Sequence, residues 1–262
     1  MNEILEILSY PFVIRALISG SLISICASIL GVILVLKHYS LIGHGLSEIG
    51  FASLSISSAL KISPMIISVP SVIIASFLIM LTKAGDTAIA VASSAALSLG
   101  IIISSLTNSI SNTSSFLFGS VLAVNEADLI FSVILSFVII ILFVIFYNRL
   151  FLITYNEDYA RSLGINTAFY QIMISLLTAL IVVSGMRIMG TLLISGVIIL
   201  PAVSAKNLAS GFKALIIISG VISILAFLTG LIISFIFNIP TGAGIILTNT
   251  IILILTRAIK TK

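Results

Sequence analysis

His44 and Glu48 are the two side chains whose types and spacing could do chemistry in this sequence. They stand four residues apart in the segment Gly-His-Gly-Leu-Ser-Glu, so on an α-helix they share one face, with Cβ atoms roughly 5–6 Å apart. An imidazole nitrogen and a carboxylate oxygen supply half of a site for Zn²⁺ or Mn²⁺, and the other ligands would come from other helices, a partner or water. The alternative is a pair that bonds to itself and to neighbouring helices, and the spacing alone leaves both interpretations open.

The chain around this pair is too apolar for a soluble protein. Of its 262 residues 60% are hydrophobic and 8% are charged, and the mean hydropathy is +1.37. A soluble domain carries about 25% charged residues. The composition therefore excludes a cytosolic enzyme, a nucleic-acid-binding domain and a disordered chain. It predicts an all-α polytopic membrane protein in which residues 1–262 form a single transmembrane domain.

Nine apolar stretches have about the length that crosses a bilayer. We expect nine spans, or eight if one stretch is re-entrant, at 12–36, 41–60, 64–82, 87–107, 129–148, 168–185, 188–205, 213–237 and 242–258. Ionisable residues inside spans mark function by default, which favours a functional role for the histidine and glutamate pair.

The basic residues predict the orientation. With nine crossings and the N-terminus outside, nine of the twelve are cytoplasmic, as the positive-inside rule requires: Lys37, Lys83, Arg149, Arg161, Lys206, Lys213, Arg257, Lys260 and Lys262. Lys61 and Arg187 are then outside, and Arg15 lies near the outer start of the first span. Glu126 and Asp128 are expected on a solvated outer loop.

Four other features could serve a transport path or a partner. Pro201 could break a span and line a path, or could be a packing kink, and Asn238 begins a turn signal between spans. The segments 155–164 and 205–209 could form short helices that dock on a partner, or could be solvated loops. The sequence has no G-x-x-x-x-G-K-[ST] loop, so any ATPase must be another chain.

Six groups of segments, in one order along nearly the whole chain, resemble a known family. The segment 40–48 is similar to that family's Ser-Leu-x-Gly-Asp-Ala-Leu-Ser-His run, and 156–164 to its Asp-Pro-Glu-x-Ala-x-x-x-Gly stretch. Further likenesses lie at 86–89 with 96–100, at 118–122, at 189–205 and at 240–243. The chain thus resembles the membrane permeases of bacterial ABC importers for zinc and manganese, a family that also includes iron transporters.

The resemblance implies a type II ABC importer-like permease in the bacterial plasma membrane, with a divalent metal as transported substrate and no permanently bound cofactor. Its implied partners are a second copy of the chain, an ATP-binding subunit, an extracytoplasmic metal-binding protein and membrane lipid, but no nucleic acid. The implied metal residues are His44 and Glu48, which exchange the order of the family's acid and histidine. The resemblance also implies cytoplasmic coupling by Asn156, Glu157, Ala160, Arg161, Gly164, Ala205 and Lys206. It implies a path or gate at Pro201 and Asn238. Asn238 stands where the family often has aspartate.

Three other functions stay open on the sequence. A siderophore or cobalamin permease of the same architectural class would need a wider, mostly apolar path. An ion-coupled secondary transporter would use Glu48 as a proton carrier and would need no ATP. A membrane-embedded metalloenzyme would need a further ligand, for which His38 at a span end is available.

Overall fold

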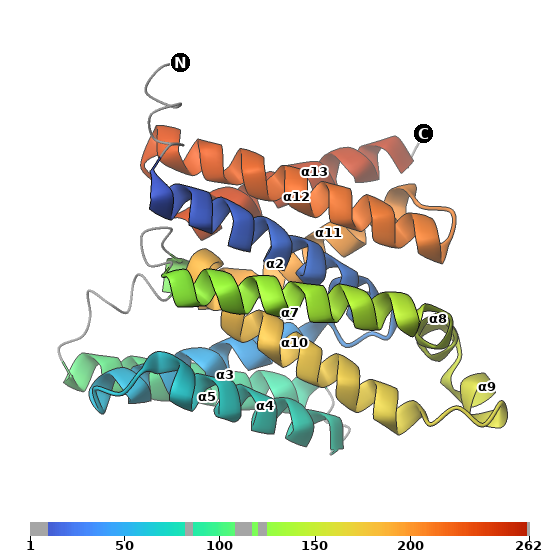
Figure 1. Cartoon of the computed structure of the whole chain (residues 1–262), viewed down its shortest axis with the longest axis horizontal. Helices are drawn as coiled ribbons and strands as arrows, with labels where there is room; N and C mark the ends of the chain where they lie inside the picture. The colour runs from blue at the N-terminus through green and yellow to red at the C-terminus, as the bar shows by residue number, and fades with distance from the viewer. Residues whose placement is uncertain (1–9, 82–85, 108–116, 120–124, 261–262) are drawn as a thin grey trace.

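The computed structural model describes residues 10–81, 86–107, 117–119 and 125–260, and their regular elements are all helices (Figure 1). Nine long helices of this described part run side by side along the longest axis. They are α2 (Pro11–Leu36), α3 (Ser40–Ala59), α4 (Pro64–Leu81), α5 (Asp86–Leu106), α7 (Glu126–Ile145), α10 (Thr167–Met189), α11 (Thr191–Leu208), α12 (Phe212–Phe237) and α13 (Thr241–Lys260). Two short helices, α8 (Tyr147–Tyr155) and α9 (Glu157–Ser162), lie at one end of the bundle.

The long helices fall on the nine predicted apolar stretches, which confirms an all-helical membrane protein. Seven of them are long and apolar enough to cross a membrane by length and composition. In α4 the residues Met65–Ile79 form a shorter apolar helix. α3 falls short because it carries the histidine and glutamate pair and a series of serines along its 20 residues.

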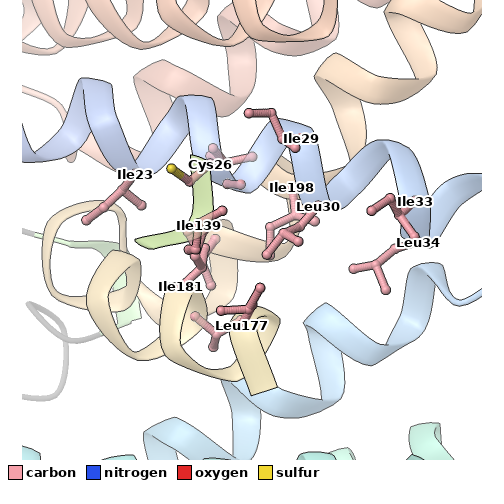
Figure 2. Packing of buried hydrophobic residues seen from close by; sticks show 14 of the residues in the cluster. Ile23, Cys26, Ile29, Leu30, Ile33, Leu34, Ile139, Leu177, Ile181 and Ile198 are labelled. Atoms are coloured by element: carbon pink, nitrogen blue, oxygen red, sulfur yellow. The ribbon is translucent and has the colours of Figure 1, made fainter. Parts of the chain in front are cut away.

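α2 and α10 form the centre of the bundle. In each, 72% of the membrane-length window is buried, against 22% in α5 at the edge. Figure 2 shows the side chains of α2 meeting Ile139 of α7, Leu177 and Ile181 of α10 and Ile198 of α11 in one continuous cluster. Helices that are apolar on every side belong in such a position, and lipid replaces water around the others.

The basic residues gather at the end of the bundle where α2 finishes, which we call the basic end. Successive long helices alternate in direction, so this end carries Lys37, Arg149, Arg161, Lys206, Lys213, Arg257 and Lys260 (Figure 1). The opposite end carries Arg15, Lys61 and Arg187. Lys83 and Lys262 lie outside the described residues. This unequal distribution of basic residues between the two ends agrees with the one predicted from the sequence.

The opposite end differs from prediction in the place of two acids. Glu126 and Asp128 belong to the first turn of α7, where Asn125 and Asp128 form a capping box, so a solvated loop was the wrong expectation. The side chain of Asp128 is 9% exposed and forms an ion pair with Arg187 of α10. Glu126 forms an exposed ion pair with Arg15 of α2. The two acids therefore connect α7 to the two central helices.

Candidate functional site

α3 carries the candidate metal pair and is packed closely against α5. The glycine at position 45 permits this approach, since a Cβ there would lie 2.7 Å from Cγ2 of Ile89. On another side Gly43 lies against Ile198 of α11. α3 is unbroken from its first residue to its last, so His44 and Glu48 stand on a regular helix.

The predicted contact between His44 and Glu48 is present. Nε2 of His44 lies 3.2 Å from Oε1 of Glu48. The imidazole side chain is 42% exposed, whereas the carboxylate side chain is 6% exposed. The second carboxylate oxygen, Oε2, is buried and has no hydrogen-bond donor among the described residues.

This geometry leaves a buried anionic oxygen open beside a half-exposed imidazole. A buried carboxylate oxygen without a donor is costly unless a cation or a proton satisfies it. Within the described residues no group of three or more His, Cys, Asp and Glu side chains comes together. One copy of the chain therefore brings two side chains that could bind a metal to this place, and a complete coordination shell would need ligands from elsewhere.

The segment 156–164 forms the short helix that its sequence predicts. Oδ1 of Asn156 caps α9 by accepting a hydrogen bond from the backbone N–H of Tyr159 at 3.0 Å. At the other end Gly164 adopts φ +77°, a left-handed conformation that glycine enters without strain. The backbone N–H of Ile165 then donates to the carbonyl of Ala160 at 3.1 Å, which closes the helix in a Schellman motif.

The Glu157 carboxylate fixes α9 to the bundle. Its Oε2 accepts hydrogen bonds from Lys37 Nζ at 3.2 Å and from Gln171 Nε2 at 2.6 Å, and its Oε1 accepts one from Arg161 at 2.8 Å. Burial raises the pKa of Glu157, but the charge and hydrogen bond of Lys37, with Arg161 and Gln171, outweigh it, so this pKa lies below its ordinary value. Burial lowers the pKa of Lys37, and the neighbouring carboxylate offsets part of that effect.

The second predicted docking segment is not a separate helix. α11 runs unbroken through Pro201 to Leu208, so Ala205 and Lys206 belong to its last turn, and of the two alternatives for Pro201 a break of the helix is excluded. A proline removes one backbone hydrogen bond, and the packing around this buried residue keeps the helix continuous. Ala205 is buried and Lys206 is exposed at the basic end.

The two predicted path residues lie far apart along the bundle. Pro201 is one turn beyond Ile198, the residue that faces α3 at Gly43. Asn238 ends α12 at the opposite end of the bundle, in a left-handed conformation with φ 51°, and its side chain is exposed. The structure therefore brings Pro201, and not Asn238, toward the helix that carries the metal pair.

Comparison with known proteins decides the family. The model of the ABC 3 transport family matches residues 9–260, nearly the whole chain. The chain belongs to the ABC 3 transport family. As an ABC 3 protein it is the membrane permease of an ABC transporter, a transport subunit and not itself a catalyst, and it resides as a multi-pass protein in the bacterial plasma membrane.

Named relatives and a solved structure match this ABC 3 permease over almost its full length. The manganese import system permease protein ScaB of Streptococcus gordonii is 30% identical over 258 residues, 97% of this chain and 93% of the relative. The high-affinity zinc uptake system membrane protein ZnuB of Buchnera aphidicola is 27% identical over 250 residues, 93% of this chain and 95% of the relative. The solved structure of PsaBC from Streptococcus pneumoniae in complex with Fab superposes with a TM-score of 0.87 at 28% identity, covering 97% of this chain and 94% of that one.

Proposed function

We propose that this chain is the membrane-spanning permease of an ATP-driven importer of divalent manganese or zinc ions, with iron as a further candidate substrate. The observation that carries the proposal is the buried, donor-free Oε2 of Glu48 beside the half-exposed imidazole of His44. The two metals are those named for the relatives, manganese for ScaB and zinc for ZnuB. The metal is the cargo, and no permanent cofactor is part of the proposal.

Two copies of the chain would complete the coordination shell. One imidazole nitrogen and one carboxylate oxygen from each copy make four ligands, the number that Zn²⁺ prefers, in a nitrogen and oxygen mixture that Mn²⁺ also accepts. The 42% exposure of the His44 side chain leaves it accessible to a second copy. A transport site must also release its ion. A set of imidazole and carboxylate ligands suits this requirement, because it binds the ion less tightly than a closed cage of cysteine thiolates.

The proposed topology has nine crossings with the N-terminus outside and the basic end in the cytoplasm. His44 lies four residues from the start of α3, so at 1.5 Å per residue it stands about 6 Å inside the basic end of the helix, and Glu48 about 12 Å inside. The metal pair is then in the cytoplasmic half of the membrane. An ion would reach it from outside and leave it by a short route, as alternating access in a type II importer-like permease requires.

The proposed partners occupy the two ends. An ATP-binding subunit would dock at the basic end on α9, through Asn156, Glu157, Ala160, Arg161 and Gly164, with Ala205 and Lys206 beside it. An extracytoplasmic metal-binding protein would dock at the opposite end. Pro201 would shape the path next to α3, and Asn238 would act at the outer mouth. Lipid would cover the exposed apolar side chains of the outer helices.

The test is metal uptake by the complex of this chain with its ATPase, reconstituted in liposomes. His44→Ala and Glu48→Ala should abolish uptake of Mn²⁺ and Zn²⁺ while the ATPase still copurifies, because each variant removes half of the ligands. Glu126→Ala, which removes an exposed carboxylate at the opposite end, is the matched control and should transport normally. Normal uptake by both pair variants would refute the proposed site.

The same liposomes separate the rival functions. Uptake that proceeds without the ATPase and ATP would indicate a secondary transporter. Uptake of a metal chelate that does not depend on the His44 and Glu48 side chains would indicate a siderophore or cobalamin permease. Either result would overturn the proposed function.

A further inference from the structure

The basic end contains a partly buried ion pair between elements that are distant in sequence. Lys37 caps the C-terminus of α2, and Glu157 begins α9, 120 residues later. The Lys37 side chain is 8% exposed and the Glu157 side chain 27%. A charge pair this enclosed behaves differently from a surface ion pair, since removing one partner leaves the other buried without compensation.

The Glu157 side chain joins three parts of the molecule through its two oxygens. It binds Lys37 at the end of α2, Gln171 on α10, and Arg161 one turn along α9 itself. α2 and α10 are the two central helices, whereas α9 lies outside the bundle at the basic end (Figure 1). A displacement of α9 is therefore transmitted first to the ends of the two central helices.

Lys37 also belongs to the tight turn that leads into α3. Only Lys37, His38 and Tyr39 separate α2 from α3. His38 adopts φ 60°, and the backbone N–H of Tyr39 donates back to the carbonyl of Leu34 at 2.8 Å. Because this turn is short and hydrogen-bonded, a displacement of Lys37 would also move the first turn of α3.

The metal pair begins one helical turn beyond this point. At 1.5 Å per residue, His44 stands about 6 Å along α3 from its first residue. Tyr39, Ile42 of α3 and Ile174 of α10 line a small hollow beside Lys37. The ion pair thus connects an outlying helix to the metal-bearing helix through few covalent and hydrogen-bonded steps.

We propose that Lys37 and Glu157 are positioning residues that transmit the displacement of α9, caused by the ATPase, to the α2–α3 turn and so to the His44 and Glu48 side chains. The inference rests on the proposed function, since it takes α9 as the docking helix and the pair as the metal site. It goes beyond that function in assigning the mechanical link, which neither residue type nor local sequence reveals.

The test measures metal ions imported per ATP hydrolysed by the reconstituted complex. Lys37→Gln, on α2 and not on the docking helix, should leave ATPase binding and hydrolysis near wild type and lower the ions imported per ATP at least about 5-fold, the lower bound of typical coupling between sites. Glu157→Gln, which removes the other half of the pair, should lower the same ratio. The exchange Lys37→Glu with Glu157→Lys restores opposite charges and should recover most of the ratio. Arg15→Gln, which breaks the exposed ion pair at the other end of α2, is the matched control and should keep the wild-type ratio.

The outcomes separate this inference from the proposed function. If His44→Ala abolishes uptake while Glu157→Gln and Lys37→Gln keep the wild-type ratio, the link is refuted and the metal site stands. If the ATPase no longer binds to the Lys37→Gln variant, or its hydrolysis and uptake fall together so that the ratio is unchanged, the pair is merely structural and the inference is again refuted. If His44→Ala transports normally, the proposed function itself has failed. Should Glu157→Gln not assemble, Lys37→Gln tests the same link from its other side.

Discussion

Replacing Gly31 by alanine should destabilise the bundle because α2 and α11 touch there through their backbones. A Cβ on residue 31 would lie 1.8 Å from the carbonyl oxygen of Ile198 and 2.9 Å from its carbonyl carbon. Ile198 lies next to Leu30 in the central cluster shown in Figure 2. Because the obstructing atoms are backbone atoms, no side-chain rotation on α11 can make room, and the two helices must separate.

The magnitude follows from two opposing effects. Overpacking a well-filled core costs about 1–3 kcal/mol, and a clash with backbone belongs at about 3 kcal/mol. Alanine stabilises a helix interior by about 1 kcal/mol relative to glycine. The net loss of about 2 kcal/mol corresponds to a melting temperature lower by about 4–8 °C for a chain of this size.

Cys26 provides the assay without further engineering. It is the only cysteine in the sequence, and its side chain is completely buried in α2, so a thiol-reactive fluorophore labels it only as the bundle opens. Gly220→Ala is the matched control, because a Cβ on residue 220 of α12 meets nothing within 4 Å. This variant should melt at the wild-type temperature or up to about 4 °C higher.

Two results would refute this account of the α2–α11 contact. One is a Gly31→Ala protein that melts with the wild type, and the other is a Gly220→Ala protein that loses as much stability. The double variant with Ile198→Ala gives a further check. It should be less stable than Gly31→Ala by about 2–5 kcal/mol, since it removes a buried side chain and leaves the obstructing carbonyl in place.

Two further predictions use the same melting assay, the second together with limited proteolysis. Asp128→Asn breaks the enclosed ion pair with Arg187 and should lower the free energy of unfolding by about 3–5 kcal/mol. Arg15→Gln breaks an exposed ion pair and should lower it by at most about 1 kcal/mol. Equal melting temperatures for the two variants would contradict the argument from burial. Gly164→Ala forces a side chain into a left-handed conformation with open space around it, at a strain of about 1–2 kcal/mol. It should loosen the end of α9 and increase proteolysis there without changing the melting temperature of the bundle, and unchanged proteolysis would count against the Schellman termination.

The helices could be predicted because a bilayer restricts the chain so strongly. Apolar runs of about 20 residues have few other structures available, and their observed ends lie within a few residues of the predicted ones. The largest disagreement is between α10 and α11, where Arg187 was taken as a break between spans. The structure continues α10 past it to Met189, because Asp128 neutralises the arginine, and ends the helix at Gly190 with φ 90°.

The site could be predicted only where it is local. The spacing of His44 and Glu48 is enough to predict their contact, since i and i+4 meet on any regular helix. The burial of Glu48 depends on how α5 and α11 cover α3, and that arrangement depends on contacts between helices far apart in sequence. The ion pair of Lys37 with Glu157 joins residues 120 positions apart, and in the sequence each looks like an ordinary charge at a helix end.

The arrangement of charges supports the α2–α3 turn as the place where, in the proposed link, a movement of α9 would reach His44 and Glu48. At the opposite end, ion pairs from α7 hold Arg15 of α2 and Arg187 of α10, so the two central helices are joined there. At the basic end, Glu157 binds both central helices, while the contact of His44 with Glu48 lies within α3. A force on α9 therefore acts on central helices that are already joined at their far end. This force would be relieved most easily at the basic end of the two helices. There the three-residue turn leads into α3, about one helical turn before His44.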